Sequence, residues 1–353
     1  MTLEESIAGI KGLDEESMLE TQKKLDNLTK PLGSLGKLEE LIRQLAGIFK
    51  SSEPRVDKKA IIVMCSDNGV CIENISSCPK EVTASVTKNF TRGITAINVF
   101  AKMSGADLKV IDVGVDDDLH AYPEILDKKI RRGTDNIVNG PAMSTEEALR
   151  AIEIGIETMG ELKEKGYSLV ATGEMGIGNT TTSSCIAAVL MQISPEEVVG
   201  KGAGLTKEGL DHKIAVVKRA IEKNKPDALD PIDVLAKVGG FDIAGLTGCF
   251  IGAAIHRMPI LIDGFISSVA ALVAIKIEER VRDFIFPSHG SAEPGAMKVL
   301  KQIHFEPMLM MNMRLGEGTG AALAFLLFDA ALEAYYKMGT FEDAIIEKYL
   351  PLD

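Results

Sequence analysis

The chain has 353 residues, a formal net charge of −12, 46% hydrophobic and 25% charged residues, and 33 glycines. This apolar content excludes a disordered chain, and the acidic balance excludes the basic surface that DNA- or RNA-binding proteins need. With no tryptophan and 5% aromatic residues, the chain also lacks the stacking platforms of single-stranded nucleic-acid binders.

The first predicted elements are two helices within residues 14–50. Asp14 can cap the first helix, which we expect to end at about residue 28. A turn-rich break follows over residues 29–36. The second helix is predicted from apolar residues at helical spacing, namely Leu38, Leu41, Ile42, Leu45 and Ile48.

From residue 60 onward, short apolar runs alternate with helical patterns. The predicted strands cover residues 60–64, 108–113, 168–172, 260–263, 281–286 and 308–314. The predicted helices cover residues 82–103, 145–165, 180–192, 207–223, 241–256, 265–276 and 319–337. This alternation predicts an α/β fold, with a parallel Rossmann-like sheet flanked by helices. The strand runs are nearly continuous in apolar residues, as expected of strands buried on both faces.

The longest apolar stretch, residues 248–275, is interrupted by His256, Arg257, Pro259 and Asp263. A membrane span needs about 20 nearly uncharged residues, so we predict none here. The acidic N-terminus lacks the apolar core of a signal peptide. The cysteines do not have metal-binding spacing: Cys65, Cys71, Cys78, Cys185 and Cys249. We therefore predict a cytoplasmic protein with reduced thiols, without a bound metal or other cofactor.

Polar residues and glycines gather directly after the predicted strands. Such segments stand at residues 66–69, 173–182, 263–264, 287–291 and 316–320. The carboxyl ends of parallel strands meet at one edge of the sheet, where open α/β sheets bind ligands. We therefore expect these loops to form one site.

Glycine-rich loops that precede predicted helices suit a phosphate group, because a helix N-terminus offers unpaired N–H groups and partial positive charge. The loops match neither G-x-G-x-x-G nor the Walker pattern, so tight turns with threonine caps remain the alternative. Lys213 could add a point charge or be solvated. The candidate phosphate- and ribose-binding residues are Gly176, Ile177, Gly178, Asn179, Thr180, Gly202, Ala203, Gly204, Lys213, Asp242, Asp263, Gly290, Ser291, Gly318 and Gly320.

Two glutamates, Glu174 and Glu317, stand close to glycines at predicted strand ends. Paired carboxylates in one cleft suit general-base catalysis or stabilisation of a developing cation. Asp242 and Asp263 are further candidates, with helix capping or a strand-end turn as the alternative. His289 could act as a base, as a metal ligand or in loop hydrogen bonding. These parts are compatible with phosphoribosyl transfer, but they do not select it over other phosphate-ligand enzymes.

Taken together, these loops resemble those of the nicotinate-nucleotide–dimethylbenzimidazole phosphoribosyltransferase family of cobamide biosynthesis. The resemblance rests on residues 25–39, 173–181, 263–266, 288–293 and 314–322, which span nearly the whole chain in order. It implies transfer of phosphoribose from nicotinate mononucleotide to an aromatic lower-ligand base, 5,6-dimethylbenzimidazole first, giving an α-ribotide and nicotinate. Glu317 matches the family's general base and Glu174 its second carboxylate.

The resemblance also implies a small helical domain from residues 1–58 and 338–353, and a large α/β domain from residues 59–337. It implies a homodimer that needs no metal. By alignment with the family, the acceptor-base pocket would draw on Lys80, Lys88 and Leu315. Asn68 departs from the family, which usually has histidine at that position.

Two alternative functions remain open. Some relatives resemble this family but ribosylate phenol or p-cresol as a pair of unequal subunits, so a phenol acceptor and a heterodimer with a paralogue are possible. The chain could instead be a non-catalytic nucleotide-binding partner subunit, against which the intact Glu174–Glu317 pair argues. A dehydrogenase is disfavoured because G-x-G-x-x-G is absent.

Overall fold

The computed structural model describes residues 3–202 and 204–348. Within these residues a six-stranded sheet has the order β3-β2-β1-β4-β5-β6, with all neighbouring strands parallel. The strands are β1 Lys59–Ser66, β2 Ala106–Gly114, β3 Ile125–Asp127, β4 Leu169–Met175, β5 Ile260–Ile262 and β6 Ile285–Pro287. The predicted fold class is confirmed. The strand order reverses between β1 and β4, which is where open parallel sheets bind ligands.

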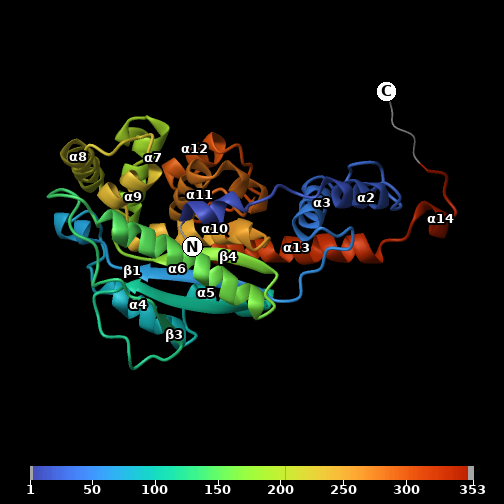
Figure 1. Cartoon of the computed structure of the whole chain (residues 1–353), viewed down its shortest axis with the longest axis horizontal. Coiled ribbons are helices and arrows are strands. Elements are labelled where there is room, and N and C mark those ends of the chain that lie inside the picture. Colours follow the sequence, from blue (N-terminus) through green and yellow to red (C-terminus); the bar gives the residue numbers. More distant parts are fainter. Residues whose placement is uncertain (1–2, 203, 349–353) are drawn as a thin grey trace.

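Helices pack on both faces of this sheet (Figure 1). They are α1 Leu3–Ala8, α2 Glu15–Leu25, α3 Lys37–Phe49, α4 Val82–Thr91, α5 Ala96–Ser104, α6 Thr145–Glu164, α7 Asn179–Met191, α8 Lys207–Asn224, α9 Pro231–Val238, α10 Phe241–Ile255, α11 Phe265–Ile277, α12 Pro294–Gln302, α13 Thr319–Lys337 and α14 Phe341–Ala344. Met64 of β1 lies against Gly245 of α10, whereas Ile61 lies against Gly318 at the start of α13. Residues three apart on a strand point to opposite faces. Helices α10 and α13 therefore cover opposite faces of the sheet.

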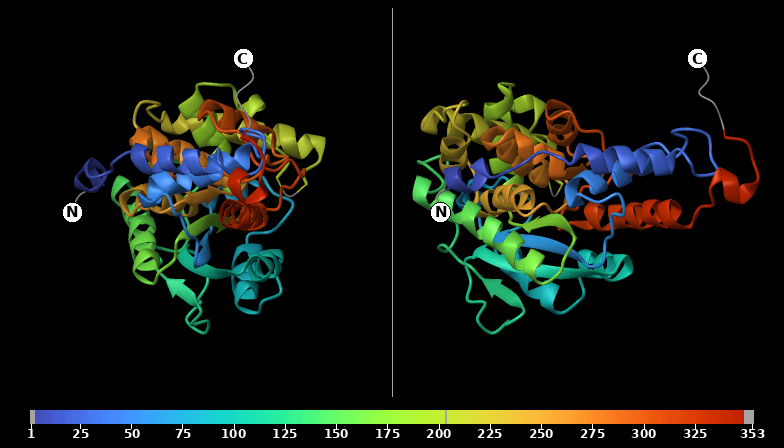
Figure 2. Two further views of the ribbon diagram at one scale, coloured as in Figure 1. Left: turned by 90° about the vertical axis from the view of Figure 1, so that its right-hand side faces the viewer. Right: turned by 45° about the vertical axis from the view of Figure 1, so that its right-hand side comes forward.

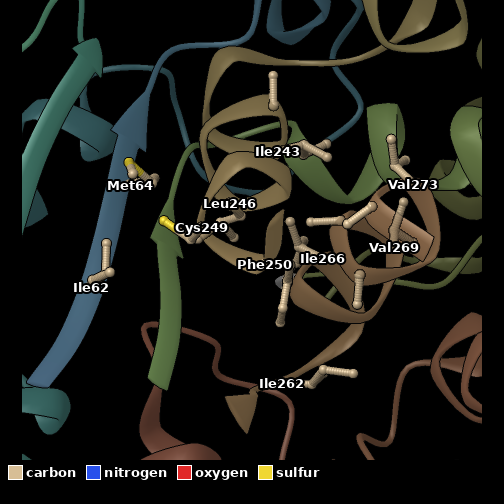
Figure 3. Close-up of a cluster of buried hydrophobic side chains, with 14 of the residues drawn as sticks. Ile62, Met64, Ile243, Leu246, Cys249, Phe250, Ile262, Ile266, Val269 and Val273 are labelled. Atoms are coloured by element: carbon tan, nitrogen blue, oxygen red, sulfur yellow. The ribbon is translucent and has the colours of Figure 1, made fainter. Parts of the chain in front are cut away.

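The main hydrophobic core lies under α10 and α11 (Figure 3). Ile62 and Met64 of β1 lie on the side of α10 that carries Leu246 and Cys249, whereas Phe250 of α10 lies beside Ile266 of α11. All eight residues of β1 are buried, as a central strand covered on both faces requires. This packing fixes the carboxyl ends of β1 and β4 next to the polar loops.

A second hydrophobic cluster lies at the end of the molecule where α2 and α3 pack beside α13 (Figures 1 and 2). Its buried members are Leu25, Leu28, Ile42, Ala331 and Tyr335. The helix α13 runs unbroken from the sheet to this cluster. The division into domains at residues 58 and 338 stays a prediction, and its residues 1–2 and 349–353 lie outside the described chain.

The structure differs from several of the predicted elements, and it contains β3, α9 and α12, which were not predicted. Residues 308–314 form no strand and make one isolated bridge, His289 to Leu309; Met310 and Met311 are exposed there, so this apolar run has no buried face. The predicted strand 281–286 is mostly a 3₁₀ helix, Glu279–Phe284. The predicted helix 82–103 is two helices, because Gly93 has a φ of +71° between them.

Candidate active site

A cavity of about 610 Å³ opens at the carboxyl ends of β4 and β5, a size that suits a small organic ligand. The loops after β4, β5 and β6 and the loop before α13 supply most of its walls. The sequence-predicted residues that line it are Glu174, Gly176, Ile177, Gly178, Asn179, Thr180, Gly202, Asp263, Ser291, Leu315 and Glu317. Four of the five predicted strand-end segments contribute to this wall, whereas residues 66–69 do not line it.

Glu174 lies near the end of β4 and is buried, with 8% of its surface exposed. Its Oε2 accepts a hydrogen bond from the side-chain amide of Asn179, the first residue of α7. Burial, followed by the nearby charge of Asp242, raises the pKa of Glu174 to about 8. A carboxyl group with such a pKa can hold its proton at neutral pH.

Glu317 stands in a left-handed backbone conformation with a φ of +62°, between Gly316 and Gly318, which also have positive φ. Such strain in a residue other than glycine costs of order 1–3 kcal/mol and is found most often at functional sites. Its Oε2 has no hydrogen-bond partner among the described residues. Burial raises the pKa of Glu317, and the Asp263 charge adds to this rise while a backbone hydrogen bond from Ile97 opposes it.

Two glycines bring these glutamates into one cavity. A Cβ atom at Gly173 on β4 would overlap the carbonyl oxygen of Glu317. A Cβ atom at Gly316 would lie 2.5 Å from Oε1 of Glu174. The loop before α13 can therefore lie directly on the end of β4 only because both positions lack a side chain.

Three of the candidate phosphate-binding residues, Thr180, Gly202 and Lys213, meet near the start of α7. Lys213 of α8 is 1% exposed, so the solvated alternative is wrong, and its Nζ donates to Thr180 Oγ1 at 2.7 Å. A Cβ atom at Gly202 would lie 3.5 Å from the same Nζ. Burial lowers the pKa of Lys213 to about 8, against the opposing charge of Glu293. A buried ammonium beside a helix N-terminus and a glycine loop suits a phosphate.

Asp263 performs the capping role that was the alternative for it, but on a distant helix. Its carboxylate accepts backbone N–H groups from Gly318, Gly320 and Ala321 at 3.1, 2.8 and 3.0 Å. The N-cap of α13 is Gly318, which has no side chain, so Asp263 supplies the missing acceptor. Burial raises the pKa of Asp263, and the neighbouring His289 opposes the rise.

Several predicted residues do not line the cavity. Asp242 is fully buried behind the wall, where its Oδ2 accepts from Asn179 at 2.9 Å. A Cβ atom at Gly320 would overlap the His289 ring, and one at Gly290 would lie 2.5 Å from Met310 Sδ, so both glycines serve packing. Lys213, Gly318 and Gly204 are also absent from the wall, although Lys213 bonds to Thr180 of the wall. Ala203 lies outside the described residues.

Lys80 and Lys88 lie away from the cavity, unlike their predicted place in the acceptor-base pocket. Lys80 pairs with Asp116, and Lys88 Nζ lies 2.6 Å from Asp117 Oδ2. The same segment instead presents Val82 and Val86 to the cavity, together with Ser76. The two valines are four residues apart on α4 and share a face, whereas Lys88, two residues further on, lies on another face.

The cavity also contains residues that the sequence patterns did not select. They are Met175, Phe265, Ile266, Ser267, Glu293, Asn312 and Arg314, in addition to Ser76, Val82 and Val86. The stretches 263–266, 288–293 and 314–322 contained some of them, but only as parts of longer matching segments. No spacing rule distinguishes a wall residue from its neighbours in an irregular loop.

Within residues 3–202 and 204–348, no group of three or more His, Cys, Asp or Glu side chains could hold a metal ion. In the same part of the chain, no helix is long and apolar enough to cross a membrane. The five cysteines are free, and Cys65, Cys185 and Cys249 are buried.

Comparison with known proteins agrees with this geometry. A family model described as phosphoribosyltransferase matches residues 10–346. The chain is 60% and 59% identical, over 100% of both sequences, to the nicotinate-nucleotide–dimethylbenzimidazole phosphoribosyltransferases of Ruminiclostridium cellulolyticum and Clostridium acetobutylicum. The crystal structure of the enzyme of that name from Thermus thermophilus superposes with a TM-score of 0.89 at 38% identity, covering 96% of this chain and 100% of that one. The chain belongs to the nicotinate-nucleotide–dimethylbenzimidazole phosphoribosyltransferase family.

Proposed function

We propose that this chain transfers phosphoribose from nicotinate mononucleotide to 5,6-dimethylbenzimidazole, giving an α-ribotide and nicotinate. The observation that carries the proposal is one cavity that holds both Glu174 and Glu317 and adjoins the buried cation of Lys213. The names of the relatives support the donor and the acceptor. All of the relatives reported above carry the dimethylbenzimidazole name, so the phenol alternative gains no support.

The reaction suits these residues physically. The donor's pyridinium is a cationic leaving group, so the bond from its nitrogen to ribose breaks without strong acid assistance. The positive charge that builds on the ribose is favoured by the nearby carboxylate of Glu317. Glu317 takes the N–H proton of the acceptor as the new bond from nitrogen to ribose forms on the face opposite nicotinate. Lys213, Thr180 and the glycine loops hold the phosphate.

The test is a competition assay. Purified protein is incubated with nicotinate mononucleotide and an equal mixture of dimethylbenzimidazole, adenine and phenol, and product masses are measured. We expect nicotinate release with the dimethylbenzimidazole ribotide as the main product. Glu317→Gln should lower turnover by about 10²-fold or more while donor binding persists. Donor binding without nicotinate release from any acceptor would instead favour the non-catalytic partner subunit.

We also propose that the chain works in the cytoplasm as a homodimer that does not bind nucleic acid. Free cysteines and an acidic balance support the first and last points. Exposed apolar side chains on two helices that pack together, Val99 and Met103 of α5 and Leu326 of α13, support self-association. Light scattering on the purified chain would contradict the dimer if it gave the mass of one chain.

A further inference from the structure

The Asn179 side chain joins two buried carboxyl groups that come from different elements. Its Nδ2 donates to Oε2 of Glu174 on β4 and, at 2.9 Å, to Oδ2 of Asp242 on α10. Asp242 is 0% exposed, and its second oxygen, Oδ1, has no hydrogen-bond partner among the described residues. The two N–H groups of the Asn179 side-chain amide thus donate to two different carboxyl groups, one to each.

Two ionised carboxylates cannot share such a dry site without a cation, so the pair retains a proton. The charged groups acting on Glu174 are Asp242, Asp263 and Glu317, and all three are acids. Burial raises the pKa of Asp242 to about 6, which is below the value of about 8 for Glu174. The proton therefore stays with Glu174 near neutral pH.

The remaining neighbours do not alter this charge balance. The titratable groups that face the pair from other elements are Cys65 on β1, Cys71 after it, Asp263 after β5 with His289 beside it, and Glu317 before α13. Arg314 lines the same cavity as Glu174, but the hydrogen bonds that both carboxyl groups accept within the described residues come from Asn179. Burial raises the pKa of the Cys65 thiol well above its ordinary value, and it raises that of Cys71 to about 12. Both thiols are neutral over the pH range of interest.

The contacts of the two carboxyl oxygens of Glu174 decide which of them carries the proton. Oε2 of Glu174 is occupied as an acceptor by Asn179, whereas Oε1 lies toward Gly316 in the cavity wall. Glu174 lines the cavity and Asp242 does not. A proton on Oε1 is therefore the one that a bound substrate can meet.

We propose that Asp242, which Asn179 holds next to Glu174, is a positioning residue whose negative charge keeps Glu174 as a neutral acid. The Oε1–H of Glu174 then donates a hydrogen bond to a substrate oxygen. Glu317 alone then accepts the proton of the incoming nucleophile. The hydrogen bond from Glu174 to a substrate rests on the proposed function. The proton that the Glu174–Asp242 pair retains does not depend on it.

Infrared difference spectroscopy on the ligand-free protein tests the proton directly. We expect the carbonyl stretch of a protonated carboxyl group at pH 7 that disappears with a midpoint near pH 8, and that is missing in Glu174→Gln. Asp242→Asn removes the neighbouring negative charge and should move this midpoint down by about one pH unit or more. A spectrum without a Glu174 band at pH 7, or an unchanged midpoint in Asp242→Asn, overturns the proposal.

Turnover measurements test whether Glu174 donates a hydrogen bond to the substrate. A glutamine at position 174 can accept from Asn179 with its oxygen and donate with its amide, so it mimics the protonated acid. Glu174→Gln should lose less than about tenfold in kcat and should lack the alkaline fall that loss of the Glu174 proton causes, whereas Glu317→Gln should lose about 10²-fold or more. If Glu174→Gln is as damaging as Glu317→Gln, Glu174 acts in its charged form and the proposal is wrong. A protein without transferase activity would contradict the proposed function but leave the infrared titration intact.

Discussion

Lys213 is a buried cation that lies behind the cavity wall and donates a hydrogen bond to Thr180 of that wall. Because burial lowers its pKa to about 8, the ammonium is present below that pH and is lost above it. We expect the KM for nicotinate mononucleotide to rise by up to about tenfold per pH unit above pH 8. Lys213→Met should raise this KM at pH 7 and remove its pH dependence, which initial-rate measurements from pH 6 to about 9.5 can check.

The matched control is Lys218, on the same helix but exposed and paired with Glu196. Lys218→Met should leave the KM unchanged at every pH, and a similar rise there would contradict the role of Lys213.

The lowered pKa of Lys213 also affects the stability of the fold. Unfolded Lys213 keeps its proton up to its ordinary pKa of 10.5, so the burial penalty is full below about pH 8 and is relieved as pH rises between these values.

The two glutamates could be predicted from the sequence because a carboxylate among glycines has no packing role. Lys213 and Asp242 were candidates as well, but their burial and their partners could not be predicted, since each depends on which neighbouring helix covers the side chain. Lys213 is a common surface residue on an amphipathic helix until α7 packs over it. Asp242 stands at the start of α10 like an ordinary cap, but its carboxylate is used by Asn179 instead.

Among the helices, α13 depends on a hydrogen-bond acceptor from another element, the carboxylate of Asp263 directly after β5. Asp263→Ala would leave three buried N–H groups of α13 without their partner, and we expect the free energy of unfolding to fall by about 2–4 kcal/mol. The control is Asp230→Ala, which removes the exposed cap of α9 and should cost about 1 kcal/mol. Chemical denaturation measures both. Equal losses would show that Asp263 is no more than an ordinary cap.

Long elements were predictable because their apolar pattern covers many residues. Helices α6 and α13 match the expected ranges closely. The strand β3 was not predicted, because only one of its three residues, Ile125, is buried and no continuous apolar run marks it, in contrast to the equally short but fully buried β5. Some glycines also serve helix packing rather than loops: a Cβ atom at Gly155 of α6 or at Gly248 of α10 would overlap the backbone of the other helix.

For the whole molecule, the two hydrophobic clusters predict two levels of stability. Leu28→Ala removes a buried side chain from the small cluster of α2, α3 and α13, at a cost of about 2–4 kcal/mol. Hydrogen exchange should then accelerate in α2, α3 and the end of α13, with the sheet amides unchanged. This result would support the predicted helical domain. Phe250→Ala, in the main cluster, is the control and should accelerate exchange in the sheet. Equal acceleration everywhere in Leu28→Ala would mean one cooperative unit.

The unbroken course of α13 has an evolutionary consequence. Phe325 and Phe328 belong to the main cluster, whereas Ala331 and Tyr335 belong to the small one. One residue inserted between them would rotate Tyr335 by about 100° around the helix axis. An insertion of seven residues would return Tyr335 to its original face of the helix but would move it by about 10 Å along the axis. Descendants of this chain can therefore gain or lose residues in their surface loops. The number of α13 residues between the two clusters, in contrast, has to stay the same.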